Sequence, residues 1–155
     1  MHAKTLNFVM ILFLFTTFSF GENTSYFKLK VVDEQTGRGV PLVELSTVND
    51  IVYYTDSQGV VAFYEPGLMN KNVWFFVKSH GYDSYKDTFG YSGGSFFTKP
   101  GGYGEIKIKR INRAERLYRI TGQGIYSDSV KLDLPVPISE PVFNSAVLGQ
   151  DSTRH

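Results

Sequence analysis

The feature that most constrains the fold is a pair of glycine turns, at 36–41 and 55–59, set among short stretches of alternating residues. In the stretch 26–31 the odd positions are apolar and two of the even ones are lysines. This period of two is typical of a β-strand with one buried and one wet face. Gly37 and Gly59 can adopt the positive φ values that tight turns require. The segment therefore predicts β-strands joined by tight turns.

Similar patterns extend along most of the chain. Further strands are expected at 40–48, 51–55, 60–64, 73–79 and 104–111. Strands at such short spacings, separated by turn residues, indicate a sandwich or barrel, and no helix of ordinary length is evident. Residues 83–103 alternate glycines with aromatic residues, and we interpret them as a long loop or irregular hairpin with its rings against the sandwich. The predicted fold class is all-β.

The first 21 residues have the order of a secretory signal peptide. A start with Lys4 and no acid is followed by a largely apolar run to Phe20, with small residues near Gly21. A transmembrane anchor is the alternative, but a span needs about 20 apolar residues and this run is shorter. We expect cleavage near Gly21, giving an exported protein (periplasmic, surface-bound or secreted) with no stable membrane span.

Charge and cysteine content narrow the possible partners. Cleavage would remove one of the 16 basic residues and none of the 15 acidic ones, so the mature chain has no surplus of cations. Nucleic acid is therefore not an expected partner, because phosphate binding relies on excess Lys and Arg. The chain has no cysteine, so an exported domain of this sequence depends on core burial for its stability.

The character of the sequence changes at residue 112. Arginines alternate with apolar residues up to Ile120, and a run with regularly spaced prolines follows. We divide the chain into a signal peptide (1–21), a β-sandwich domain (22–111) and a segment 112–155. The last is interpreted as a linker or the start of a truncated second module, or as an irregular arm wrapped on the first domain.

The motifs Asp-Glu-Gln-Thr-Gly-Arg-Gly-Val-Pro (33–41) and Thr-Asp-Ser-Gln-Gly-Val-Val-Ala-Phe (55–63), with a later strand ending at Gly81-Tyr82, resemble the carboxypeptidase regulatory-like domains. The resemblance covers about residues 26–111. It implies a seven-stranded, prealbumin-like antiparallel β-sandwich, related in fold to carbohydrate-binding modules and to repeats of bacterial surface adhesins. The segment from Asn112 resembles the linker that leads, in larger exported bacterial proteins, into a β-propeller-like region. The matched residues make turns and core, so they do not specify a function.

Catalytic and metal-binding patterns are weak. His80 with Asp83 and Asp87 is the most metal-like group, but zinc needs three or four converging ligands, usually with a second His or a Cys. A serine nucleophile drawn from Ser92 or Ser95 lacks the Gly-x-Ser-x-Gly turn. Calcium at Asp50 and Asp56 lacks the carboxylate density of a dedicated site. We therefore predict no catalytic residue, no metal site and no cofactor.

Aromatic residues around the glycine-rich loops are the strongest binding signal. Flat rings can stack on sugar rings, which makes polysaccharide a candidate ligand, with another protein domain as the alternative partner. The candidate ligand-binding residues are Tyr82, Tyr85, Tyr91, Phe96, Phe97 and Tyr103. The competing interpretation is that these rings pack over the hydrophobic core of a domain without disulfides and cover it. A basic run from Lys107 to Arg119 could likewise be an acidic-polysaccharide patch or a solvated strand face.

Three functions follow from these observations. The first is a non-catalytic exported module for binding or spacing, with carbohydrate as the possible ligand. The second is the N-terminal accessory domain of a β-propeller-type hydrolase whose catalytic part lies elsewhere. The third is a transthyretin-like carrier or adhesive oligomer joined through its edge strands.

Overall fold

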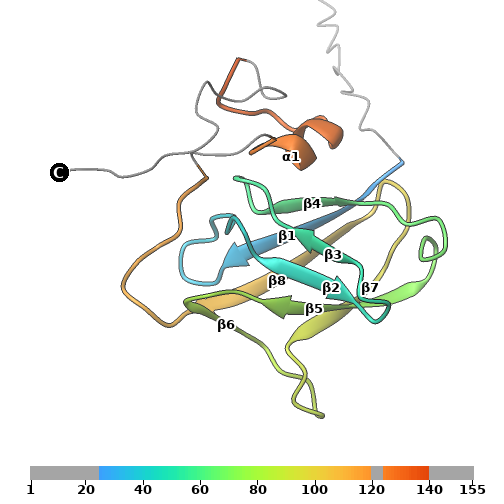
Figure 1. Cartoon of the computed structure of the whole chain (residues 1–155), viewed down its shortest axis with the longest axis horizontal. Coiled ribbons are helices and arrows are strands. Elements are labelled where there is room, and N and C mark those ends of the chain that lie inside the picture. The colour runs from blue at the N-terminus through green and yellow to red at the C-terminus, as the bar shows by residue number, and fades with distance from the viewer. Residues whose placement is uncertain (1–24, 120–123, 140–155) are drawn as a thin grey trace, which may run out of the picture.

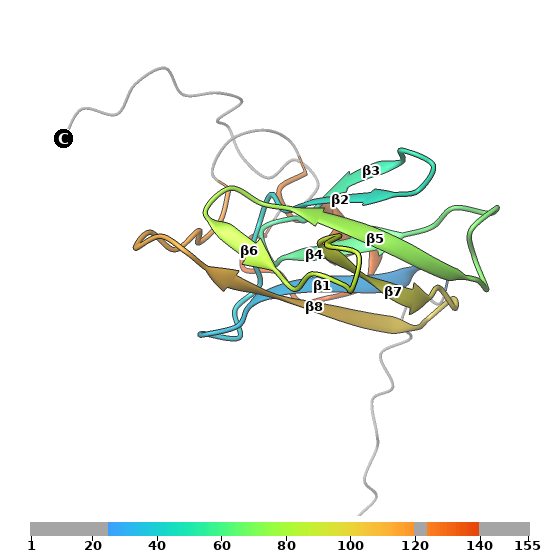
Figure 2. The same cartoon turned by 90° about the horizontal axis from the view of Figure 1, so that it is seen from below.

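The computed structural model of the chain describes residues 25–119 and 124–139 (Figure 1). The expected signal segment lies outside these residues. Two sheets of four strands face each other, and Figure 2 shows them as two layers. The strands are β1 (Phe27–Asp33), β2 (Glu44–Thr47), β3 (Val52–Tyr54), β4 (Val60–Phe63), β5 (Asn72–Lys78), β6 (Tyr82–Ser84), β7 (Gly93–Phe97) and β8 (Tyr103–Arg110). One short helix, α1 (Ser127–Lys131), follows them. The all-β prediction is confirmed.

The order of the strands places distant parts of the chain side by side. Sheet A has the order β4-β1-β8-β6, and sheet B has the order β3-β2-β5-β7. β1 pairs with β8 in parallel, while the other strand pairs are antiparallel. The first and last strands of the sandwich are therefore central neighbours in sheet A, so both ends of the domain are held by the same ladder.

Two details of the predicted fold differ from the structure. The described residues form eight strands rather than seven, and the sheets are not wholly antiparallel because of the β1–β8 pair. The segment 83–103, expected to be a loop or hairpin, begins at the end of β6 and contains β7. β6 belongs to sheet A and β7 to sheet B, so the segment crosses between sheets. Gly93 and Gly94 occupy two positions of β7, which removes the apolar alternation that would have revealed it.

The core lies between the two sheets and is rich in phenylalanine. Phe63 and Phe75 come from opposite sheets and meet edge to face, with ring centroids 5.0 Å apart. Both side chains are fully buried, as are Leu29 and Leu45 from the facing central strands. Each such side chain contributes about 1.5–3 kcal/mol by leaving water. This burial meets the requirement set by the absence of cysteine.

The two glycine turns pack directly against each other. A Cβ added at Gly39 would lie 1.8 Å from the carbonyl oxygen of Gln58, so only glycine fits there. Gly59 has a φ of +75°, which also favours glycine. The backbone of β1 joins the contact, since the Val31 N–H donates to the Gly59 carbonyl at 2.8 Å. The two motifs of the sequence are thus one structural unit.

We predict that Gly39→Ala lowers the free energy of unfolding by about 2–4 kcal/mol, because the added methyl group overlaps backbone that cannot move independently. Gly67→Ala is the matched control. Nothing lies within 4 Å of its added Cβ, and a gain of up to about 1 kcal/mol is expected from reduced freedom of the unfolded chain. Urea unfolding of both variants checks this; equal stability of the two would contradict the close packing of the turns.

Candidate ligand-binding face

The outward face of sheet B carries a contiguous group of aromatic side chains. The strand register places Phe76 of β5 between Ser46 of β2 and Gly93 of β7. One row further along β5, Trp74 stands beside Ser95 of β7. Small neighbours on these strands leave both rings partly exposed. We name the group formed by Trp74, Phe76 and Tyr91 the aromatic strip.

The rings of the aromatic strip contact one another edge to face. Trp74 and Phe76 have ring centroids 6.2 Å apart with planes at 69°. Phe76 and Tyr91 have centroids 5.8 Å apart with planes at 76°. Such pairs are worth about 0.5–1.5 kcal/mol beyond their buried area, so they hold one another in place. The rings of the strip therefore contact one another but do not lie in one plane.

Polar and apolar groups border the strip along β2 and β3. The Tyr54 hydroxyl donates to Glu44 Oε2 at 3.1 Å, and Lys78 Nζ lies 3.9 Å from the other oxygen of the same carboxylate. Val52 and Tyr54 are about half exposed. Glu44, Tyr54 and Lys78 thus place a carboxylate, a phenol and an ammonium group next to the rings. Such polar groups can hydrogen-bond the hydroxyl groups of a ligand.

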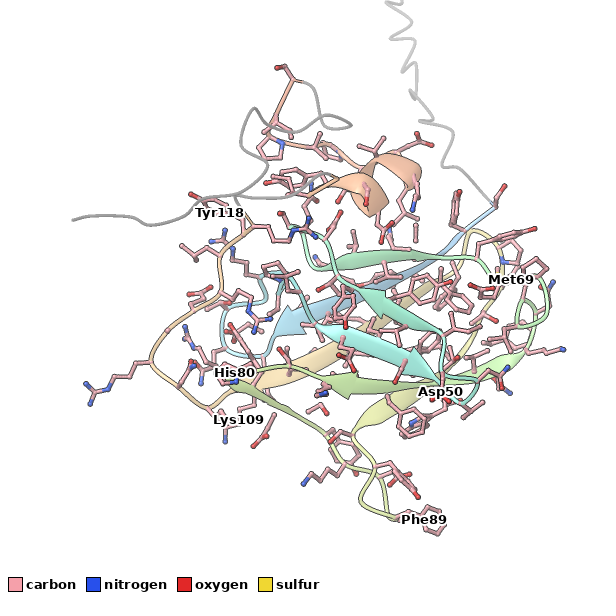
Figure 3. All side chains as sticks on the ribbon, in the orientation of Figure 1. Asp50, Met69, His80, Phe89, Lys109 and Tyr118 are labelled. Atoms are coloured by element: carbon pink, nitrogen blue, oxygen red, sulfur yellow. The ribbon has the colours of Figure 1, made fainter. Side chains whose placement is uncertain are left out.

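A turn between β6 and β7, held by hydrogen bonds to the Asp87 side chain, extends the aromatic surface. Asp87 Oδ1 accepts hydrogen bonds from the backbone N–H groups of Phe89, at 2.9 Å, and Tyr91, at 2.8 Å. Phe89 is 83% exposed at the tip, and Figure 3 shows it pointing away from the sandwich. Tyr85 is 80% exposed on the same connection. The turn is thus fixed by its own hydrogen bonds while its large side chains remain in solvent.

The structure divides the predicted ligand-binding residues into groups. Tyr82 is buried, and its hydroxyl accepts the Arg116 backbone N–H at 3.2 Å. Phe96 packs inward, 6.3 Å from Phe27 and from Phe75 between centroids, so it and Tyr82 are core residues. The exposed ones on sheet B or its β6–β7 connection are Tyr85, Tyr91 and Phe97. Tyr103 is exposed on sheet A, away from the others.

Sequence reasoning did not single out Trp74 and Phe76. They lie in the strand expected at 73–79, and neither was among the candidate ligand-binding residues. The structure shows that β5 alternates between buried and partly exposed positions. The signal was present in the sequence: Asn72 and Lys78 stand in phase with Trp74 and Phe76, so the polar ends mark the outward face.

The metal-like group does not assemble. The carbonyl of the exposed His80 accepts a hydrogen bond from Arg116 Nη2 at 2.8 Å, and Figure 3 shows the residue at the end of β5. Asp87 is engaged in its own turn. Across residues 25–119 and 124–139, no three side chains of His, Asp or Glu lie close enough to share a metal ion. The same part of the chain has no helix with the length and apolarity of a membrane span.

The segment after β8 returns to the sandwich, and we call residues 111–119 and 124–139 the arm. Arg116 holds its first half, since Arg116 Nη1 donates to the carbonyls of Pro41, at 2.7 Å, and Leu42, at 3.1 Å. Its guanidinium also lies over the Tyr82 ring, 5.9 Å from the centroid. In Figure 1 the arm leaves β8, passes the end of the sandwich and brings α1 over β4.

The second half of the arm is fixed by a buried carboxylate. Asp56, only 3% exposed, accepts four hydrogen bonds. Ser129 donates to Oδ2 from its backbone N–H, at 2.7 Å, and from Oγ, at 2.6 Å. Gln58 and Val60 donate their N–H groups to Oδ1. Burial raises the pKa of Asp56 above its ordinary value, and the hydrogen bonds act in the opposite direction.

Comparison with known proteins gives no identity for this arrangement. No protein-family model matches the chain, and no curated protein matches it.

We predict that Asp56→Asn releases α1 and lowers the free energy of unfolding by about 2–4 kcal/mol. In either orientation the new amide N–H₂ group faces backbone N–H donors, from Ser129 or from Gln58 and Val60. Hydrogen–deuterium exchange of residues 125–134 should accelerate. Lys131→Ala, which removes the half-exposed partner of Asp128 and leaves the bonds between Asp56 and Ser129 in place, should cost less than Asp56→Asn. Unchanged exchange in Asp56→Asn would contradict the role of this carboxylate.

Proposed function

We propose that the chain is a non-catalytic, exported β-sandwich binding module of the carboxypeptidase regulatory-like, prealbumin-like kind, and that it binds polysaccharide on the outer face of sheet B. The observation that carries the proposal is the aromatic strip, in which Trp74, Phe76 and Tyr91 lie next to one another on a face bordered by polar groups. The interlocked glycine turns support the family assignment, because they involve the motifs on which the resemblance rests.

The angles between the rings favour one kind of polysaccharide. Rings that are nearly perpendicular cannot all lie against one flat crystalline surface, whereas a single flexible chain can turn to meet each of them. Glu44 and Lys78 would then hydrogen-bond its hydroxyl groups from the border of the strip. The expected ligand is a soluble polysaccharide chain and not an insoluble crystalline one.

The chemistry of the face supports binding without hydrolysis. Glycoside hydrolysis ordinarily uses two carboxyl groups on either side of the bond that breaks. Among the outward positions of β2, β3, β5 and β7, Glu44 is the one carboxylate. It is already engaged by Tyr54 and Lys78.

We predict that the chain without residues 1–21 is retarded in affinity gels that contain a soluble neutral polysaccharide. Trp74→Ala and Tyr91→Ala should each weaken this binding by about tenfold, since removal of one stacking or hot-spot ring typically costs about 1–2 kcal/mol. A panel of soluble and crystalline polysaccharides gives the ligand class.

Tyr64→Ala is the matched control. Tyr64 is also about half exposed, but it follows β4 in sheet A and contacts Tyr26. Its loss should leave the retardation unchanged, and thermal unfolding confirms that each variant is folded. If no polysaccharide retards the parent protein, or if Tyr64→Ala weakens binding as much as Trp74→Ala, the proposed site is wrong.

The docked arm favours a second candidate, an accessory domain that holds a following module of a longer exported protein. Arg116 and Asp56 fix the arm at two places, so whatever follows it would start from a defined position on the sandwich. In that case Asp56→Asn should change the spacing of the modules in a longer protein, measured by small-angle scattering, and leave glycan binding intact. If the chain is a carrier or adhesive oligomer, sedimentation should instead give a molar mass that is a multiple of that of the monomer.

A further inference from the structure

The arm and the outer face of sheet A enclose two adjoining hollows. One, of about 370 Å³, lies between the glycine turns and the first half of the arm, with Arg38 and Tyr118 in its wall. The other, of about 360 Å³, lies between β1, β8 and residues 134–135, with Tyr103 in its wall. Lys30 and Gln58 line both hollows. Gln58 Nε2 donates to the Pro135 carbonyl at 2.7 Å and so ties the arm to the sandwich at their junction.

The charged side chains that line the hollows are all cations. Lys30 lines both hollows. Arg38 places a guanidinium group in the wall of the first hollow, and Lys28 places an ammonium group in the wall of the second. Arg38 Nη2 donates to the Leu117 carbonyl at 3.2 Å, which fixes the guanidinium in place. On the outer face of sheet A, Glu105 lies opposite Lys30 in the ladder and accepts a hydrogen bond from the Tyr103 hydroxyl at 2.5 Å. The hollows together therefore attract anions.

Each hollow also has a half-exposed tyrosine. Tyr118 is 56% exposed in the first hollow and Tyr103 is 52% exposed in the second. Lys28 Nζ lies over the Tyr103 ring, 5.3 Å from its centroid. Burial, and then the bond to Glu105, raises the pKa of Tyr103 to about 12, so its phenol stays neutral at physiological pH. Each hollow thus has a half-exposed tyrosine ring and at least one cation in its wall.

We infer that this groove binds an acidic polysaccharide, with successive uronate residues in the two hollows. The carboxylates would pair with Lys30 and Arg38, and the sugar rings would stack on Tyr118 and Tyr103. The inference shares with the proposed function only the class of ligand. The site is on the opposite sheet and involves different residues.

Other anionic polymers fit less well. An acidic peptide would use the cations but gain little from two separate tyrosine faces. A nucleic acid would use both, but a near-neutral protein lacks the cation surplus on which phosphate binding depends. Both polymers are included in the test.

The experiment is titration calorimetry of the chain without residues 1–21 against polygalacturonate, with polyglutamate, single-stranded DNA and a neutral galactan for comparison. We expect polygalacturonate to bind and the combined variant Lys30→Gln/Arg38→Gln to weaken it by about tenfold or more. Tyr118→Ala should weaken it as well, because it removes a ring and no charge.

The matched control is Lys107→Gln/Lys109→Gln. It removes the same charge from exposed positions of β8, in the sheet that forms the groove. Equal weakening by the two double variants would show general attraction and overturn the inference, as would equal or tighter binding of polyglutamate or DNA, or no binding of polygalacturonate. Trp74→Ala separates the two proposals. It should weaken neutral-polysaccharide binding about tenfold while leaving polygalacturonate binding unchanged, so either site can fail without the other.

Discussion

The buried carboxylate of Asp56 connects the second glycine turn with the arm, 73 residues further along the chain. Removing a charge from water is costly unless hydrogen bonds replace the water. Here two donors come from the residues that follow Asp56 and two from Ser129 in the arm. The turn supplies half of the compensation and the arm supplies the rest. The docked arm therefore stabilises the folded turn, and Asp56 fixes the position of α1 on it.

The arm determines which surfaces are available to ligands. Leu132 packs on Val60 and Ala62 and covers the β4 side of sheet A. Without this cover the side chains of Val60 and Ala62, which are now buried, would face solvent. The outer face of sheet B has no such cover among the described residues, and its aromatic side chains remain exposed. The docked arm also forms the groove that consists of the two hollows, since one wall of each hollow belongs to the arm.

Strand existence was predictable where one face is buried and the other wet. β8 alternates along its length and β1 over its first five residues, and the positions of both were predicted to within a few residues. β7 was not predicted because glycines replace side chains at its start, and β6 because Tyr82 is the one large apolar side chain in it. For the candidate site, aromatic composition predicted a surface of exposed rings, but which rings are exposed depends on strand register. Tyr82 and Phe96 turned inward, and Trp74 and Phe76 outward.

The sequence by itself determined the all-β class, the glycine turns and the need for a large aromatic core, because these depend on neighbouring residues and on composition. The tertiary structure decided the parallel pairing of β1 with β8, the contact of Gly39 with Gln58 and the bond from Ser129 to Asp56. Each of these joins residues far apart in the chain. No local period records such a pairing, since it depends on how the whole core packs.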